Sequence, residues 1–475
     1  MQQDDPGEQP GTDDVETTSL ETQAQQPERV DAAGVPDTPE QAQRDLILSY
    51  YGPGTRNALK VQQGRTVGSD CEVDFLFEAD TILVREEHFE QVRGILDKLH
   101  LLYGDEDRRP VSEPVLAGVR LVRLKLGSNP HLDTLETLRI IREGGLVSLN
   151  LPDGGTDDVL ITAAGAGASG PNTVLVVAGN GAGCPAEEPE PMPAGSAPYP
   201  GYTADRAAGE GVRVVVVDTG LDEQATQRSS WLKGVTGDPD DDINGTTLDN
   251  YAGHGTFIAG VIRCVAPLAE VHVCRAFGPG GAVTEAELVQ KLDHILEHDY
   301  PDIISMSAGT YTFDATRLLS FTVFNERRLR HHKGVVMVVA AGNDGGREPF
   351  WPAAAPFTVS VGALSTQWRG RAGFSNHGGW VDVYAPGQNL VNAFPKGTYQ
   401  YRQPPHVGTG RPARVEKFYG MAKWSGTSFS TPVVAGLIAA RMSRTGENGR
   451  EAAAALIAEA QGAAQPGVGA VLLPE

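Results

Sequence analysis

Residues 212–220 read Val-Arg-Val-Val-Val-Val-Asp-Thr-Gly, and this stretch decides the fold. Such a continuous run of β-branched residues suits a parallel strand that is buried on both faces. Further runs of this kind follow downstream, at 271–276, 303–306, 335–340, 358–361 and 381–384. Helical patterns lie between several of them, as at 284–298 and 315–330. We therefore expect the α/β class, with a parallel sheet flanked by helices.

Two polar residues follow predicted strands directly. Asp218 ends the valine run, and Asn343 ends the sequence Val338-Val339-Ala340-Ala341-Gly342-Asn343. In parallel α/β sheets, reactive side chains gather at the carboxyl ends of the strands. A carboxylate there can accept a hydrogen bond from a histidine, and an asparagine amide can donate to an oxyanion. The ordinary alternative is that both residues only shape turns.

A histidine and a serine stand before apolar helical patterns. His254 lies in Ala252-Gly253-His254-Gly255-Thr256, and Ser428 lies in Gly426-Thr427-Ser428-Phe429-Ser430-Thr431-Pro432. A serine at a helix N-terminus presents its backbone N–H and the positive end of the helix dipole to a developing oxyanion. The alternatives are a core or capping histidine and a serine that only caps its helix. Together with Asp218 and Asn343, the two residues supply the parts needed for acyl transfer through a serine ester.

These four segments, in this chain order, resemble the subtilisin-like serine proteases (subtilases, peptidase S8 family) over about residues 205–460. The resemblance implies a subtilisin-like fold and a serine endopeptidase that cuts protein or peptide substrates through an acyl-enzyme, without a cofactor. It assigns Asp218 as the acid of the triad, His254 as general base, Ser428 as nucleophile and Asn343 as oxyanion donor. We expect activity near neutral to alkaline pH, with His254 neutral.

The resemblance also implies where an extended substrate binds. Ser307-Ala308-Gly309 looks like the family's edge segment, which pairs with the substrate as an added strand. Ala341-Gly342 would line the far side of the S1 pocket, which holds the residue before the cut bond, the P1 residue. Asp344 and Glu348 either favour a basic P1 residue or are solvated surface charges.

The chain departs from the family pattern after Gly260, where Val265-Ala266-Pro267 follows almost at once. The family's common calcium-binding loop between these points is missing, so we expect no metal site there. Residues 238–242, Asp-Pro-Asp-Asp-Asp, lack an EF-hand pattern and are interpreted as a solvated loop rather than a cation site. A long segment at 396–423, basic and aromatic in part, precedes the serine motif and is expected to border the cleft.

The first two hundred residues lie outside the resemblance. Strand patterns at 73–84, 118–126 and 146–151 and helical stripes at 86–102 and 132–141 predict a small α+β domain. A further strand is suggested at 173–178, and the Pro- and Glu-rich stretch 179–201 is expected to be exposed. The expected organisation is a disordered acidic tail (1–45), a small α+β domain (46–151), a partly extended linker (152–204), the catalytic domain (205–462) and a C-terminal tail (463–475).

The role of the α+β domain is open at this stage. Prodomains of the family are small α+β units, so residues 73–151 are expected either to inhibit the protease within the same chain or to bind a separate partner. If they form a prodomain, the exposed stretch 179–201 is where the chain would be cut. The competing functions are a catalytically silent binding or scaffold protein on the same fold, and a zymogen or sensor held inactive by its N-terminal domain.

Composition narrows the partners and the compartment. The formal net charge of −22 argues against nucleic acid and anionic membranes as partners, because both repel an acidic surface. The apolar runs are too short to span a bilayer, and the N-terminus lacks the apolar run of a secretory signal, so we expect a cytoplasmic location. Four cysteines are too few for a disulfide scaffold, and we expect Cys264 and Cys274 to be thiols.

Overall fold

The structure is a computed structural model of the chain. It describes residues 36, 38–55, 59–66, 74–103, 112–127, 131–150, 155–177, 186–407 and 412–474. Most of the predicted acidic tail lies outside these residues. Its last part does not, because helix α1 (Pro39–Tyr51) begins six residues before the predicted end of the tail at 45. Thr38 caps this helix, and Ile47 and Tyr51 are buried, so apolar contacts hold a segment that the composition suggested was disordered.

The central sheet has seven strands in the order β10–β13–β9–β15–β17–β18–β19, and every neighbouring pair is parallel. The predicted α/β class with a parallel sheet is therefore confirmed. The strands are β9 (Arg213–Asp218), β10 (Thr236–Gly237), β13 (Glu270–Arg275), β15 (Ile303–Met306), β17 (Val336–Ala340), β18 (Thr358–Leu364) and β19 (Val383–Pro386). In chain order, β10 and β13 extend the sheet on one side of β9, whereas β15, β17, β18 and β19 extend it on the other side. The carboxyl ends of β9 and β15 therefore lie at a topological switch point, where sites form in such sheets.

The valine run explains how this sheet is covered. Val214 and Val216 pack into one hydrophobic cluster with helices α5 (His254–Val265) and α8 (Thr427–Thr445). Val215 and Val217 pack into a second cluster with α6 (Glu285–His298) and α7 (Leu319–Arg327). All four valines are fully buried, and each contributes roughly 1.5–3 kcal/mol relative to an exposed side chain.

The remaining helices are shorter or lie outside the two helical layers that cover the parallel sheet. They are α2 (Phe89–Lys98), α3 (Thr134–Glu143), α4 (Glu223–Arg228) and α9 (Gly449–Gly462), with the 3₁₀ turns η1 (Glu86–His88), η3 (Ser230–Leu232), η4 (Pro279–Gly281) and η5 (Leu329–His331). None of the helices in the described part of the chain is both long and apolar enough to cross a lipid bilayer.

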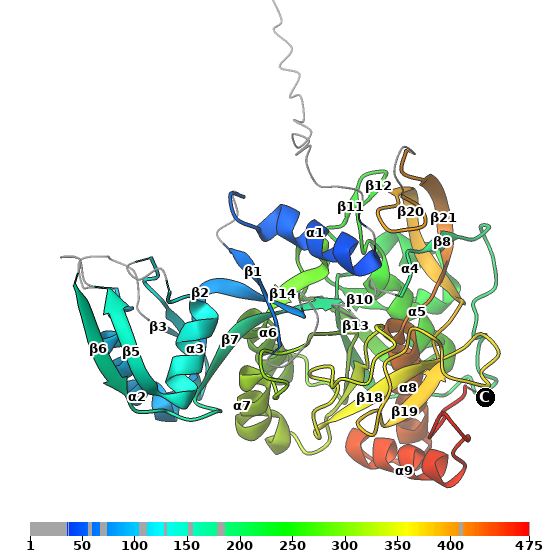
Figure 1. The fold of residues 1–475 in the computed structure, drawn as a ribbon. Helices are drawn as coiled ribbons and strands as arrows, with labels where there is room; N and C mark the ends of the chain where they lie inside the picture. The colour runs from blue at the N-terminus through cyan, green and yellow to red at the C-terminus, as the bar shows by residue number, and fades with distance from the viewer. Residues whose placement is uncertain are drawn as a thin grey trace, which may run out of the picture. The chain divides into compact units, whose positions relative to one another are not determined.

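A second, antiparallel sheet has the order β14–β7–β2–β4–β3, with β1 beside β2 and β16 beside β7. Its strands are β1 (Val61–Gly64), β2 (Phe75–Arg85), β3 (Ser112–Leu116), β4 (Val119–Arg123), β7 (Ser169–Val177), β14 (Ala282–Thr284) and β16 (Ala308–Gly309). Helices α2 and α3 share a hydrophobic cluster with β2 and β4. Figure 1 shows β7 running from beside α3 to β14, so this sheet joins the upstream residues to the edge of the subtilase-like part.

The suggested strand at 173–178 is confirmed over 173–177 as part of β7, but the rest of the predicted linker 152–204 needs correction. Within this predicted linker, β6 (Thr156–Ile161) pairs with β5 (Gly145–Asn150), and all nine residues of β7 are buried. Residues 186–191 are not an exposed connection either, since Glu188 and Pro189 are buried. Long-range pairing with β2, β14 and β16 orders β7, and the sequence indicated only its second half, residues 173–177.

A third sheet contains the predicted segment 396–423 and borders the candidate site. Its order is β11–β12–β20–β21–β8. The strands are β8 (Glu190–Pro191), β11 (Ile243–Asn244), β12 (Thr247–Leu248), β20 (Leu390–Gln400) and β21 (Val415–Trp424). Strands β20 and β21 form a long antiparallel hairpin that ends at Trp424, three residues before α8 begins.

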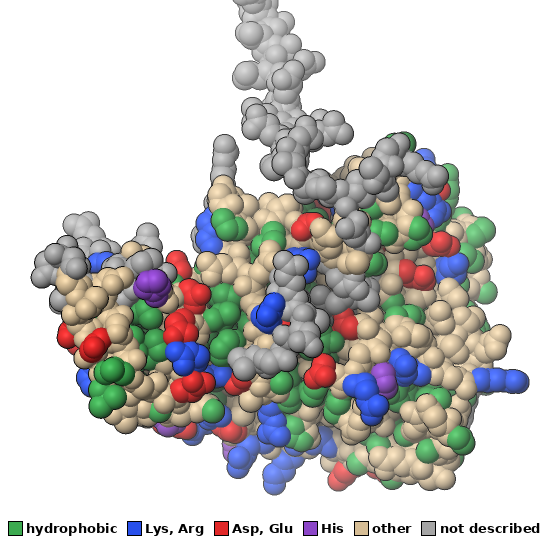
Figure 2. All heavy atoms as spheres, in the orientation of Figure 1, with side chains coloured by type: hydrophobic (Ala, Val, Ile, Leu, Met, Phe, Trp, Pro, Cys, Tyr) green, Lys and Arg blue, Asp and Glu red, His purple; other side chains and the backbone are tan. Residues whose placement is uncertain are grey.

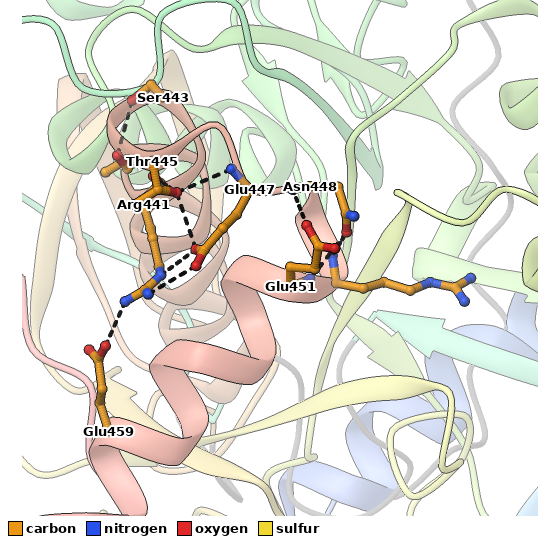
Figure 3. Close-up of polar contacts among 9 residues, drawn as sticks. Arg441, Ser443, Thr445, Glu447, Asn448, Glu451 and Glu459 are labelled. Carbon is orange, nitrogen blue, oxygen red and sulfur yellow. Dashed lines mark hydrogen bonds and ion pairs between the residues drawn. The ribbon is translucent and has the colours of Figure 1, made fainter.

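The C-terminal residues pack onto the parallel sheet and do not form a simple tail. Arg441 of α8 binds Glu447 and Glu459, which fixes α9 beside α8 (Figure 3). Asn448 caps α9 in a capping box with Glu451 (Figure 3). Beyond α9, the backbone of Tyr384 in β19 bonds to residues 470 and 472, so the predicted C-terminal tail extends the sheet edge.

Charged side chains of both signs are interspersed over the face drawn in Figure 2. Several lie close enough to form surface ion pairs, such as Arg139 with Glu136 and Arg120 with Glu86. Exposed pairs of this kind contribute little to stability, typically about 0–1 kcal/mol each. The fold therefore rests on its buried clusters rather than on surface charge.

Candidate active site

Asp218 and His254 form a hydrogen-bonded pair at the switch point. Asp218 is the last residue of β9 and His254 is the first residue of α5, and the distance between Asp218 Oδ1 and His254 Nδ1 is 2.7 Å. A carboxylate only accepts, so Nδ1 carries the proton and neutral His254 keeps Nε2 as its basic atom. Gly255 allows this close approach, because a Cβ there would lie 2.4 Å from the carbonyl oxygen of Gly220.

Ser428 and Asn343 are linked through Thr427. Ser428 is the second residue of α8, and Thr427 donates to Asn343 Oδ1 from its backbone N–H (2.8 Å) and from its hydroxyl (3.0 Å). These two bonds orient the amide of Asn343 with its oxygen toward Thr427 and its NH₂ group away from it. An NH₂ group held in this way, beside a helix N-terminus, is the kind of donor that stabilises an oxyanion.

Aromatic rings connect the histidine to the serine helix. The ring of Phe429, which follows Ser428, lies 5.3 Å from the His254 ring, and Trp424 meets His254 edge-on at 5.4 Å and 89°. The Phe429 ring packs between His254 and Phe257.

The structure pairs Asp218 with His254 and links the serine helix to Asn343 through Thr427, and it buries all four predicted residues. Asp218, His254, Asn343 and Ser428 are each 0% exposed. A substrate could not reach these side chains in the state described.

The predicted substrate-binding residues lie in two segments near Ser428, residues 307–309 and residues 341–342, hereafter the two walls of the expected substrate site. Ala308 and Gly309 form β16, and Ser307 Oγ donates to the carbonyl of Ser428 at 2.9 Å. Ala341 and Gly342 follow β17, and Gly342 N–H donates to Thr427 Oγ1 at 3.2 Å. Both walls are therefore hydrogen-bonded to the first turn of α8.

Three features of the site were missed in the sequence. The fully buried Phe350 ring touches both walls, since a Cβ at Gly309 would lie 2.3 Å from it and a Cβ at Gly342 would lie 3.1 Å from it. Trp424 contacts His254, and its place just before the serine motif was a usable signal. Residues 187–190 lie against Trp424 and Ser425, and no local pattern marks them.

The acidic segment 238–242 is tied into the protein and is not simply solvated. Asp240 is buried and accepts from the N–H of Gly253 at 2.7 Å, next to His254. Burial raises the pKa of Asp240 to about 7 and that of Asp242 to about 8. Asp238 accepts from the N–H of Arg275 at 2.8 Å. The prediction that Asp240 is solvated was wrong, because a carboxylate that accepts hydrogen bonds from backbone N–H groups cannot be distinguished in sequence from a surface carboxylate.

Removal of calcium is expected to leave the fold intact. Within the described residues, no group of three or more His, Cys, Asp or Glu side chains is placed to hold a metal ion. A chelator should therefore shift the melting temperature by less than about 2 °C, because only a bound ion contributes binding free energy to the folded state. Differential scanning calorimetry with EDTA, and again after excess Ca²⁺ is restored, measures this. A reversible loss of several degrees would contradict the prediction.

Cys264 and Cys274 are free thiols, as predicted. Burial raises the pKa of Cys264 to about 12 and that of Cys274 to about 11. A thiol needs to ionise to act as a nucleophile, so neither residue suits catalysis at neutral pH. The other two cysteines, at 71 and 184, lie outside the described residues.

The described geometry, a hydrogen-bonded acid–base pair beside a serine at a helix start, agrees with the comparisons. The model of the Subtilase family (Peptidase_S8) matches residues 209–469, more than half of the chain. The chain belongs to the subtilase family.

Individual relatives are distant and match only in part. The chain is 30% identical over 271 residues to Subtilisin-like protease 1 of Trichophyton rubrum, covering 54% of this chain and 46% of that protein. It is 29% identical over 264 residues to the Thermophilic serine proteinase of Bacillus sp. strain AK1, covering 53% and 57%. The chain thus spans about half the length of these curated relatives. A solved cold-adapted subtilisin-like serine proteinase is 23% identical, covering 56% of this chain and 90% of that one, with a TM-score of 0.42.

Proposed function

We propose that this chain is a serine endopeptidase that hydrolyses peptide bonds in protein or peptide substrates. The observation that carries the proposal is the 2.7 Å bond between Asp218 and His254, beside a serine helix tied to Asn343 through Thr427. The family match supports a protease in general terms. A silent scaffold would not require these four side chains together.

The proposed reaction has two halves. Ser428 Oγ attacks the carbonyl carbon of the peptide bond while His254 Nε2 takes the hydroxyl proton, and Asp218 stabilises the resulting imidazolium. The NH₂ group of Asn343 and the N–H of Ser428 stabilise the oxyanion. The C–N bond then breaks, and the amine leaves with the proton from His254. Water cleaves the ester in the second half with the same base, which releases the acid and restores Ser428.

The substrate's P1 side chain is inferred to be small. The Phe350 ring lies against both Gly309 and Gly342, where the S1 pocket is expected, and Tyr311 packs edge-on against this ring at 5.3 Å. The alternative of a basic P1 residue is disfavoured because the Asp344 carboxylate already accepts from the Tyr311 hydroxyl at 2.8 Å. Glycine, alanine and serine fit such a pocket.

Mapping of cleavage sites tests the proposed function. The wild-type protein is incubated with a denatured protein mixture, and new termini are identified by mass spectrometry. Cuts after small residues, absent with the Ser428→Ala variant, are expected. A Phe350→Ala variant should accept larger P1 residues. Equal cutting by wild type and Ser428→Ala would refute the proposed function, and cuts mainly after basic residues would refute the pocket assignment.

We also propose that the N-terminal part holds the protease inactive. Strand β7 lies between β14 and β16 and pairs antiparallel with both, with Leu175 opposite Val283 and Val176 opposite Gly309. This is the backbone pairing predicted for an extended substrate. We therefore propose an inhibitory segment that contains β7 in addition to the predicted range 73–151.

Two further contacts support the inhibitory role. Arg85 at the end of β2 forms an ion pair with Glu326 of α7 at 2.8 Å. Asn172 of β7 accepts from the N–H of Ala286 at 3.0 Å, in the first turn of α6. The carboxyl end of β7, at Val177, pairs with Ala308, which is next to Ser307 and its bond to Ser428. We place the cut after β7, within residues 178–185.

The wild-type protein is expected to cut itself within residues 178–185, while Ser428→Ala stays full length. The physical reason is that Val177, at the carboxyl end of β7, pairs with Ala308 next to Ser307 and its bond to Ser428, so a cut after β7 is an intramolecular reaction. Intact-mass measurement over a time course measures the cut, and activity on added substrate should rise as the cut proceeds. A wild-type protein that is fully active while uncut would contradict the inhibitory role.

Two further expectations from the sequence concern the cellular location and an independent partner-binding domain. The cytoplasmic location stays a prediction. The alternative of an independent partner-binding domain is less favoured, because β7 completes a sheet with β14 and β16 rather than leaving a separate surface.

A further inference from the structure

Residues 187–192, hereafter the strap, lie along the hairpin that borders the active site. Within the strap, β8 pairs antiparallel with β21, with Glu190 opposite Lys423 and Pro191 opposite Ala422. At its end, the N–H of Met192 donates to the carbonyl of Met421 at 3.1 Å. The strap follows directly after residues 178–185, where we propose that the chain is cut.

A buried carboxylate anchors the strap to the hairpin. Glu188 is 4% exposed and accepts three hydrogen bonds, from the N–H groups of Arg402 (2.8 Å) and Gln403 (2.9 Å) and from the Tyr399 hydroxyl (3.0 Å). The Tyr401 hydroxyl adds a bond to the carbonyl of Pro189 at 2.7 Å. A carboxylate held by this many donors is a strong and directional anchor.

The strap also bonds to the aromatic residue that touches the catalytic histidine. Trp424 Nε1–H donates to the carbonyl of Glu187 at 2.7 Å, and Ser425 Oγ donates to the Glu187 carboxylate. The Trp424 ring is almost fully buried and meets the His254 ring at 89°. Hence the bond to the strap helps to orient the Trp424 ring, which also packs against Phe257, Phe394 and Phe429 and lies beside His254.

We propose that the strap is a lasting part of the active-site wall, which stays on the hairpin after the chain is cut upstream of it. In this proposal Glu188 is a positioning residue. It fixes the strap, the strap fixes Trp424, and Trp424 holds the His254 ring in its reactive orientation. The proposal rests on the proposed protease function, and it makes residues 187–192 part of the mature enzyme rather than of the removed segment.

Departure of the strap would break several hydrogen bonds at once. The indole N–H of Trp424 and the backbone N–H groups of Arg402 and Gln403 would exchange their acceptors on the strap for water. A hydrogen bond to a charged group contributes about 1.5–3 kcal/mol, so the bonds to Glu188 favour a strap that stays on the hairpin.

The first test compares two Glu→Gln variants of the processed enzyme. Glu188→Gln places an NH₂ group among three donors. Glu416→Gln changes a Glu on the same hairpin whose side chain is 38% exposed and pairs with Arg414. We expect kcat to fall about 10–100-fold for Glu188→Gln, with KM within about threefold, and to stay within about twofold for Glu416→Gln. Equal kcat for the two variants would overturn the proposal.

A second variant keeps the test decisive if Glu188→Gln fails to fold. Trp424→Phe retains an aromatic ring beside His254 but removes the N–H that bonds to Glu187, so kcat should fall while thermal unfolding stays cooperative. A Trp424→Phe enzyme with unchanged kcat would count against the strap's role in positioning. Both variants are compared at a temperature where unfolding curves show them to be fully folded.

The second test locates the N-terminus of the processed wild type. Mass spectrometry of the active fragment should find it before residue 187, with the strap retained. An active enzyme that begins after residue 192 would overturn the proposal while leaving the protease function intact. A wild type that neither cuts substrates nor reacts at Ser428 would instead refute the proposed function. If the protein is active but uncut, the kcat comparison decides.

Discussion

Replacement of Ser428 by alanine is expected to abolish peptide hydrolysis, with kcat reduced by about 10⁶-fold. This magnitude is that of subtilisin, a member of the same family, when its nucleophile is removed. Alanine removes only the hydroxyl oxygen, so the helix start and the Thr427–Asn343 bonds should remain. The ratio of the two kcat values is obtained from initial rates on a peptide substrate. The processed wild-type enzyme is compared with a Ser428→Ala protein that is produced with the same N-terminal residue.

Ser430→Ala is the matched control for this change. Ser430 lies two residues further along α8, is equally buried, and donates its hydroxyl hydrogen to the carbonyl of Thr427 at 3.0 Å. Its loss should cost some stability but leave kcat within about tenfold, since it contacts no reacting atom. Similar large losses in both variants would indicate damage to the helix rather than removal of a nucleophile.

The second large effect is expected for Asp218→Asn, with a fall in kcat of about 10⁴-fold. The asparagine NH₂ group can donate to His254 Nδ1, which would place the ring proton on Nε2 and remove the base. The 2.7 Å contact makes this exchange direct, and the change in volume is negligible. Steady-state rates at several pH values measure the loss, which should persist at every pH where the variant is folded.

Asp222→Asn provides the comparison for Asp218→Asn. Asp222 is also buried and lies in the same turn, but it caps α4 and binds Arg228 rather than a histidine. Asparagine can still cap the helix, so kcat should change by less than about threefold. A fall in kcat as large as that of Asp218→Asn would mean that the turn as a whole, and not the bond to His254, controls the rate.

Local sequence was sufficient to predict the parts of the fold that repeat a simple pattern. The valine run at 212–217 predicted a strand buried on both faces, and alternate valines do pack into two different clusters. The motifs around Asp218 and His254 predicted residues that the structure joins directly. In both cases the physical requirement, burial or close backbone approach, acts within a few residues and so leaves a readable pattern.

The parts that could not be predicted depend on contacts between distant residues. Strand β7 is ordered by β14 and β16, more than a hundred residues away, and Glu188 is buried only because Tyr399 and the backbone of residues 402 and 403 surround it. The strand suggested at 173–178 covered only the second half of β7, and the Pro- and Glu-rich residues around Glu188 have the composition of a linker. Helix α1 did carry a signal, a Thr38–Pro39 start before an apolar stripe, but the acidic composition upstream outweighed it.

The central claim, that Ser428 is the activated nucleophile of a protease, is tested most directly by covalent labelling. The processed wild-type enzyme is treated with a fluorophosphonate probe, digested with trypsin and analysed by tandem mass spectrometry. The account predicts a single modified residue, Ser428, with labelling lost in Ser428→Ala and strongly slowed in Asp218→Asn. Enzyme that cuts substrates while Ser428 stays unlabelled, or label found on another serine at the same rate, would contradict it.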